Sequence, residues 1–207
     1  MSFLGKKSVT KAGVPQIELE SETKKINSNL DENESQVEEN QIIPKHLFIS
    51  DGNGYLKQWD IEQQKLMKDF GKIHSRGIYS LTATNDGRYL FTSDANGNLK
   101  QWGIEQQKLM KDFGKIHLGW IHSMTATNDD RYLFTSDDKG YLKQWDIKQQ
   151  KLMKDFGQIH YGQIRSIAAT NDGRYLFTSD SDGYLKQWDI EQQKLIKDFG
   201  QIHSGWI

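Results

Sequence analysis

The sequence contains no cysteine, only two prolines and no long apolar run. The lack of cysteine excludes disulfides, thiolate metal sites and cysteine nucleophiles, and it fits a reducing compartment. No stretch of about 18 apolar residues is present, so the sequence predicts no membrane span. Residues 1–7 lack the apolar core of a signal peptide, and we therefore expect a cytoplasmic protein.

The chain also lacks a clear excess of either charge, because 27 Lys and Arg stand against 28 Asp and Glu. Proteins that bind nucleic acid or anionic membranes usually carry a basic excess, since contacts with phosphate groups dominate their affinity. The net charge of −1 therefore predicts neither a nucleic-acid partner nor a membrane partner.

Residues 1–44 are poor in large apolar side chains, with one Phe and no Trp or Tyr. They hold both prolines of the chain, and five Lys stand against eight Asp or Glu. Such a segment buries too little apolar surface to offset the entropy lost when its backbone is ordered. The composition predicts a disordered acidic tail over residues 1–44 and a folded part over residues 45–207.

The folded part repeats itself with a period of 43 residues, as the spacing of Trp59, Trp102, Trp145 and Trp188 shows. Complete units span 72–114, 115–157 and 158–200, with a partial unit at 45–71 and a stub at 201–207. A period of about 40–45 residues is typical of propeller blades or of helical-pair repeats.

Within the unit 72–114, the segment 78–84 is rich in β-branched and aromatic residues, and turn signals such as Asn85-Asp86-Gly87 divide the unit into four short segments. This pattern predicts β-strands rather than helices. The second segment is apolar on both faces, which is typical of a strand buried on both sides. The fourth carries Lys108 and Lys111, as expected of an edge strand. The predicted strands are 78–84, 89–92, 99–102 and 109–113.

Trp is followed by Asp in three of the four units, at Trp59-Asp60, Trp145-Asp146 and Trp188-Asp189, and His74 precedes the turn at Gly87 by 13 residues. In these features the unit resembles the WD repeat, whose members share the Trp-Asp ending. The resemblance covers about three-quarters of the chain. It implies an all-β propeller of four-stranded antiparallel blades, here an incomplete or four-blade arc behind the disordered tail.

In this family a His, a strand Ser or Thr, a turn Asp and the Trp form a hydrogen-bonded set within each blade. By that resemblance, only the third unit supplies the turn acid, because the matching positions of the first two are Asn96 and Lys139. The implied structural set is His74, Thr92, Trp102, His117, Thr135, Trp145, His160, Thr178, Asp182 and Trp188.

The partial unit 45–71 supplies only the second, third and fourth strands of a blade. The C-terminal stub is one candidate for its missing first strand, which gives four blades where the family usually closes with about seven. We expect either that copies of the chain associate and cover the apolar end faces, or that the chain is a truncated repeat product.

Comparison of the three complete units shows where the sequence varies. Apart from one conservative core position, the positions with three different residues lie in the link before the first strand and in the turn between the second and third strands. Both connections lie at the same end of a blade, so we predict a rim that binds a protein partner. The candidate partner-binding residues are Tyr79, Trp120, His122, Lys139, Tyr161, Gln163 and Arg165.

An enzyme is the third hypothesis. The periodic His, Thr and Asp recur once per unit, which indicates a scaffold role, and His122 is the best candidate outside the period. The sequence shows no combination of a nucleophile, a general base and an orienting group that would form a catalytic site. Asp51-Gly52-Asn53-Gly54 with Glu62 lacks the glycine that a calcium-binding loop needs. We therefore predict no catalytic residue, no metal site and no cofactor.

Overall fold

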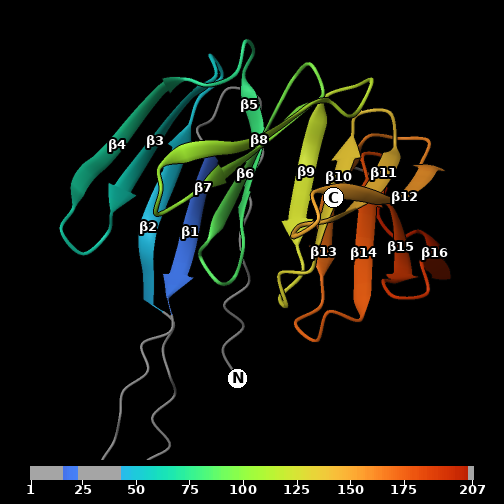
Figure 1. The fold of residues 1–207 in the computed structure, drawn as a ribbon. Coiled ribbons are helices and arrows are strands. Elements are labelled where there is room, and N and C mark those ends of the chain that lie inside the picture. The colour runs from blue at the N-terminus through green and yellow to red at the C-terminus, as the bar shows by residue number, and fades with distance from the viewer. Residues whose placement is uncertain (1–15, 23–42, 205–207) are drawn as a thin grey trace, which may run out of the picture.

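A computed structural model of the chain describes residues 16–22 and 43–204. These residues form four antiparallel four-stranded sheets, each built from strands in chain order. Figure 1 shows the four sheets side by side. The all-β fold of four-stranded antiparallel sheets predicted from the sequence is therefore confirmed.

The first sheet consists of β1 (Gln16–Glu22), β2 (Ile43–Ser50), β3 (Tyr55–Asp60) and β4 (Lys65–Lys72). The second consists of β5 (Ile78–Ala83), β6 (Tyr89–Asp94), β7 (Asn98–Gly103) and β8 (Lys108–Lys115). The third consists of β9 (Ile121–Ala126), β10 (Tyr132–Asp137), β11 (Tyr141–Asp146) and β12 (Lys151–Gln158). The fourth consists of β13 (Ile164–Ala169), β14 (Tyr175–Asp180), β15 (Tyr184–Asp189) and β16 (Lys194–Gln201).

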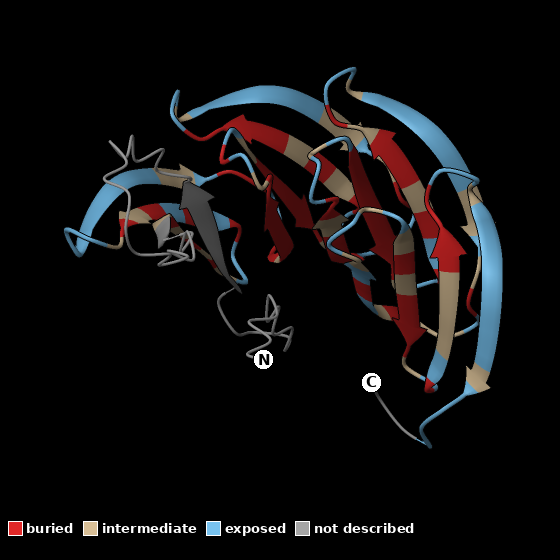
Figure 2. Cartoon of the chain, turned by 90° about the horizontal axis from the view of Figure 1, so that it is seen from below, coloured by how far each residue is buried: buried red, intermediate tan, exposed pale blue. Residues whose placement is uncertain are grey.

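The first strand of each sheet is its inner strand, and β1, β5, β9 and β13 lie against one another in chain order. The fourth strand of each sheet forms the outer edge and is mostly exposed. Figure 2 shows the sheets as an open arc, with the outer strands on its convex side and the first and fourth sheets at its ends. We call each sheet a blade from here on.

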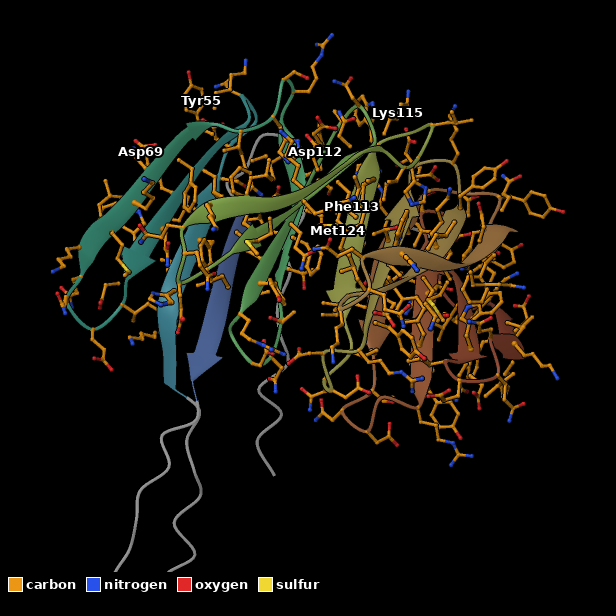
Figure 3. All side chains as sticks on the ribbon, viewed as in Figure 1. Tyr55, Asp69, Asp112, Phe113, Lys115 and Met124 are labelled. Atoms are coloured by element: carbon orange, nitrogen blue, oxygen red, sulfur yellow. The ribbon has the colours of Figure 1, made fainter. Side chains whose placement is uncertain are left out.

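The core lies between neighbouring blades rather than within one. Leu90 and Phe91 are adjacent on β6 and are both fully buried, but Leu90 packs toward the first blade and Phe91 toward the third. Figure 3 labels Phe113 of β8 and Met124 of β9, which belong to the same apolar cluster between the second and third blades. Each blade therefore depends on its neighbour to bury its faces.

The first blade differs from the expectation in the origin of its inner strand. Residues 16–22, expected to be part of a disordered tail, form β1 and pair with β2, so the prediction is wrong for these residues. The register sets Ile17 opposite Ile49 and Leu19 opposite Leu47. The physical reason is that β2 has an open inner edge, and the alternating sequence of β1 suits a strand that covers it.

β1 also takes the place in the first blade for which the C-terminal stub was a candidate. Residues 205–207 of that stub lie outside the described residues, as do residues 1–15 and 23–42 of the expected tail. Among the residues that the structure does describe, no helix is long and apolar enough to cross a membrane.

Candidate functional site

The variable positions of the three complete units meet at one end of the blades. We call this surface the variable rim and define it by the links 75–79, 118–122 and 161–165 and the turns 95–96, 138–139 and 181–182. Each link contacts the turn of its own blade: Trp120 N donates to Asp138 Oδ1 over 2.9 Å, and Gln163 N donates to Ser181 Oγ over 3.2 Å. Each of these links therefore lies beside the variable turn of its own blade.

Each turn of the rim is held by an aspartate at the end of the blade's second strand. In the second blade, Asp94 Oδ1 accepts hydrogen bonds from the backbone N–H groups of Asn96 and Asn98, each over 2.9 Å. Asp137 and Asp180 accept the equivalent bonds in the third and fourth blades. Because these carboxylates are buried, the turn backbone is fixed although the turn side chains vary.

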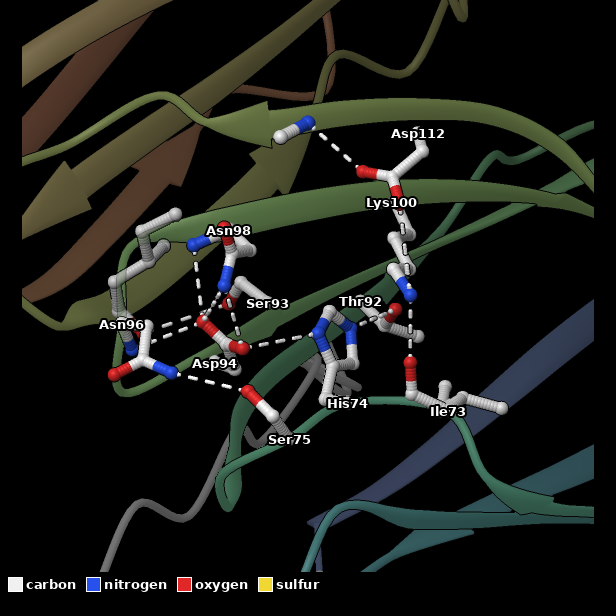
Figure 4. Close-up of polar contacts among 12 residues, drawn as sticks. Ile73, His74, Ser75, Thr92, Ser93, Asp94, Asn96, Asn98, Lys100 and Asp112 are labelled. Carbon is white, nitrogen blue, oxygen red and sulfur yellow. Dashed lines mark hydrogen bonds and ion pairs between the residues drawn. The ribbon is translucent and has the colours of Figure 1, made fainter.

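The same aspartate contacts the periodic histidine. In the second blade, His74 Nδ1 lies 3.3 Å from Asp94 Oδ2, and His74 Nε2 lies 2.8 Å from Thr92 Oγ1 (Figure 4). Trp102 Nε1 donates to the same Thr92 oxygen over 3.0 Å. One buried hydroxyl therefore joins the His, which precedes the inner strand, to the Trp of the third strand.

The corresponding contacts exist in the other two complete blades. His117 and Trp145 meet at Thr135, and His160 and Trp188 meet at Thr178. These hydrogen bonds stabilise the link that carries the variable residues.

The choice of Asp182 as the acid of this set is wrong. His160 Nδ1 lies 3.0 Å from Asp180 Oδ2, whereas Asp182 is an exposed turn residue. The acid is two residues earlier, where all three complete units carry Asp, so no blade lacks it. The Thr-Ser-Asp that ends the second strand of all three complete units marks this Asp as a periodic residue, but only the structure shows that it faces the histidine.

The buried contacts shift the pKa values of these groups. Burial alone would raise the pKa of Asp94, but the hydrogen bonds from His74 and Asn98 hold it below its ordinary value. Burial lowers the pKa of His160, and the neighbouring Asp180 only partly offsets this effect. The fold thus favours the ionised form of Asp94 and the neutral form of His160.

Three aromatic rings from two links form a cluster at the centre of the rim. Tyr79 lies on β5 and His122 on the neighbouring β9, and the two rings meet edge to face with centroids 5.5 Å apart. The Trp120 ring lies 5.2 Å from Tyr79 and 6.1 Å from His122. Trp120 is 44% exposed, whereas His122 is 7% exposed, so Trp120 covers the cluster and still offers surface to solvent.

Arg165 occupies the position on β13, in the fourth blade, that Tyr79 and His122 occupy on β5 and β9. Burial lowers the pKa of His122, and the positive charge of Arg165 lowers it further. Gln163, which precedes Arg165, has a buried side-chain oxygen that accepts no hydrogen bond within the described part of the chain. This part of the rim thus combines three aromatic rings with a cation.

The remaining predicted rim residues lie farther out. Tyr161 is 98% exposed, and the Lys139 side chain is also exposed. Leu118, which the prediction did not include, is 81% exposed at the position equivalent to Tyr161. The structure therefore brings Tyr79, Trp120 and His122 into contact and leaves Lys139 and Tyr161 at the periphery.

In residues 16–22 and 43–204, no group of three His, Asp or Glu side chains is placed to hold a metal ion. His74, His117 and His160 each lie in a different blade and contact a Thr and an Asp.

The chain was compared with protein families and with curated proteins. The family model described as "WD domain, G-beta repeat" matches residues 65–103 and residues 152–189. Both matches start at a fourth strand and end at a third strand, so each includes one complete His–Thr–Trp set. The comparison with curated proteins found no match.

Proposed function

We propose that this chain, which belongs to the WD-repeat family, is a non-enzymatic scaffold that binds a protein partner on the variable rim. WD repeats typically mediate protein–protein interactions, and proteins built from them are generally non-enzymatic. The observation that carries the proposal is the aromatic cluster of Tyr79, Trp120 and His122, which forms where the three units differ.

The cluster has the properties of a binding hot spot. Aromatic side chains and arginine contribute most of the affinity at protein interfaces, especially where a fixed framework holds them. The Trp120 ring packs against the rings of Tyr79 and His122, and the Trp120 backbone N–H donates a hydrogen bond to Asp138. Little conformational entropy is therefore lost when a partner covers the Trp120 ring.

Two polar groups beside the cluster support binding of a peptide segment. The half-buried side chain of Gln163 adds a polar group at the border of the cluster. The Arg165 guanidinium suits a partner carbonyl or carboxylate. Tyr161 and Lys139 would contact the partner at the periphery of the same surface.

The proposal retains the expectation of a cytoplasmic protein, which the cysteine-free composition supports. A catalytic role for His122 is less well supported, because its ring is packed against Tyr79 and Trp120 rather than against a nucleophile.

The test is a quantitative pull-down with the purified chain as bait. We expect Trp120→Ala and Arg165→Ala each to weaken capture of the specific partner by about tenfold or more, since hot-spot truncation costs roughly 2 kcal/mol. Leu109→Ala is the matched control, because Leu109 is 42% exposed but lies on the outer strand β8. The far-ultraviolet spectrum of each variant should equal that of the parent chain.

Recovery of the same partners by the Trp120→Ala, Arg165→Ala double variant would contradict the proposal. Loss of capture by Leu109→Ala to the same extent would also contradict it, because the outer strands would then be the binding surface.

A further inference from the structure

Every pair of neighbouring blades is joined by the same two faces. We call the face that carries Phe48 and Leu56 in the first blade the trailing face, and the face that carries Leu90, Trp102 and Ile104 in the second blade the leading face. These residues form one cluster, and their equivalents form the clusters between the second and third and between the third and fourth blades. The chain thus contains three copies of one interface.

Among residues 16–22 and 43–204, no blade lies against the trailing face of the fourth blade. Phe177 and Leu185 are half-buried there, whereas their equivalents Phe134 and Leu142 are 1% and 0% exposed. At the edge of the same face, Phe199 is 37% and Ile202 is 45% exposed. This face therefore leaves in water the residues that the other three blades bury.

The leading face of the first blade likewise has no neighbouring blade in the part of the chain that the structure describes. Leu47, Trp59 and Ile61 are half-buried, whereas Leu90, Trp102 and Ile104 at the equivalent positions are buried. The β1 register sets Ile17 and Leu19 at the backbone positions that Leu81 and Ala83 hold in the second blade. The two ends of the arc thus carry the two complementary halves of the internal interface.

We propose that the trailing face of the fourth blade binds the leading face of the first blade of a second copy of this chain. Two copies joined head to tail in this way form a closed ring of eight blades, which lies within the known range of about four to eight. Such a ring contains the joint twice, once at each meeting of the two chains.

The charges at the outer corners of the blades support this joint. Arg131 of the third blade donates through Nη1 to Glu191 Oε1 of the fourth. One unit further along, the equivalent residues are Arg174 of the fourth blade and Glu62 of the first. The proposed joint therefore brings opposite charges together.

The equivalent position between the second and third blades pairs Arg88 with Lys148. There Arg88 bonds to Asp86 of its own turn instead. The charges at the two ends of the arc thus match each other better than the charges at this internal joint.

One internal joint also contains a hydrogen bond between two glutamines, and the equivalent glutamines are present on the two end faces of the arc. Gln150 Nε2 of the third blade donates to Gln101 Oε1 of the second over 3.1 Å. The equivalent residues at the proposed joint are Gln64 of the first blade and Gln187 of the fourth. The joint can therefore satisfy polar as well as apolar groups of the two faces.

The experiment is sedimentation equilibrium of the 207-residue chain over a wide range of concentrations. We expect a mass of twice 24.0 kDa that dissociates on dilution. Phe177→Asp places a carboxylate in both joints and should weaken association by more than about 100-fold. Leu152→Asp is the control with the same new charge, because Leu152 is 45% exposed on the outer strand β12.

A charge-reversal pair tests the geometry with substitutions that leave the blade faces intact. Arg174→Glu should weaken association by about tenfold, because at each of the two joints the attraction between Arg174 and Glu62 is replaced by repulsion between two carboxylates. The double variant Arg174→Glu, Glu62→Arg should regain most of the lost affinity. Circular dichroism of each variant checks that the blades remain folded.

A mass of 24.0 kDa at every concentration would overturn the proposal. Growth into open-ended polymers would overturn the closed ring, and a two-chain mass unchanged by both Phe177→Asp and Arg174→Glu would overturn the joint. The outcome is independent of the pull-down with Trp120→Ala, because Trp120 lies on the rim and not on an end face.

Discussion

At the scale of single residues, one threonine hydroxyl in each complete blade carries two buried contacts. Thr135 Oγ1 accepts from Trp145 Nε1 over 3.1 Å and lies 2.9 Å from His117 Nε2. In the first blade Ile49 takes this place, and Trp59 Nε1 is buried without a hydrogen-bond partner among the described residues. The first blade therefore lacks the hydroxyl to which the Trp of each complete blade donates.

Replacing this hydroxyl by a methyl group should be costly. We expect Thr135→Val to lower the free energy of unfolding by about 2–4 kcal/mol, because it leaves two buried nitrogen atoms without a partner. Thr125→Val is the matched control, since the Thr125 hydroxyl is half-buried and makes one long bond of 3.4 Å to the Ala126 carbonyl. Urea unfolding curves of both variants measure the difference, and equal losses would contradict this role.

At the scale of elements, the turn that enters the third strand requires glycine. Gly97 has a φ of +81°, and a Cβ atom placed there would lie 2.2 Å from the His117 carbonyl oxygen. That carbonyl belongs to the link that enters the next blade, whose backbone donates to the Gly97 carbonyl. The glycine therefore allows two connections of the rim to approach each other.

Gly97→Ala should lower the free energy of unfolding by at least about 3 kcal/mol, because the steric clash adds to the backbone strain. Gly114→Ala separates the two effects, since Gly114 has a φ of +66° but nothing lies within 4 Å of its added Cβ. We expect about 1 kcal/mol for this control. Thermal unfolding of the two variants checks the difference, and similar midpoints would exclude the clash.

The elements also show the limits of local sequence patterns. The strands of the complete units follow from turn signals and from apolar residues on both faces. These local patterns did not predict β1, because residues 16–22 form a short, charged segment that is distant along the chain from the rest of the first blade. Their alternation of apolar and polar residues was visible, but only the open edge of β2 gives it a partner.

At the scale of the whole molecule, titrating groups in different blades act in the same direction. Burial lowers the pKa of His160 below its ordinary value of 6.5, and burial together with Arg165 lowers that of His122. The pKa values of Asp94 and Asp137 lie below 3.8, because hydrogen bonds outweigh their burial. In all four cases the unfolded chain takes up its proton at a higher pH than the folded chain.

Stability should therefore decrease in two steps as the pH falls. The histidine contribution is complete at pH values well above 6.5 and decreases as the pH drops below that value. The aspartate contribution is complete above about pH 4 and is lost as the pH falls through the lowered pKa values of the folded state. Urea unfolding at pH 7.5, 5.5 and 3.5 measures both steps, with a constant slope as the control for an unchanged folded state. A free energy of unfolding that is equal at pH 7.5 and 5.5 would contradict the first step.

The sequence by itself determined the blade, because a 43-residue period with strand patterns and turn glycines specifies one small antiparallel sheet and its neighbours. It also located the variable rim, since both variable connections must lie at the same end of an antiparallel sheet. These conclusions depend on interactions between residues that are close in the chain or related by the repeat.

The tertiary structure alone decided which acid faces the histidine, which strand completes the first blade and which rim residues touch. Each of these depends on the direction of a side chain or on an open edge that a distant segment covers, and neither is encoded in local spacing. The choice of Asp180 over Asp182 was settled by strand geometry, because the last residue of β14 points inward whereas the turn residue faces solvent.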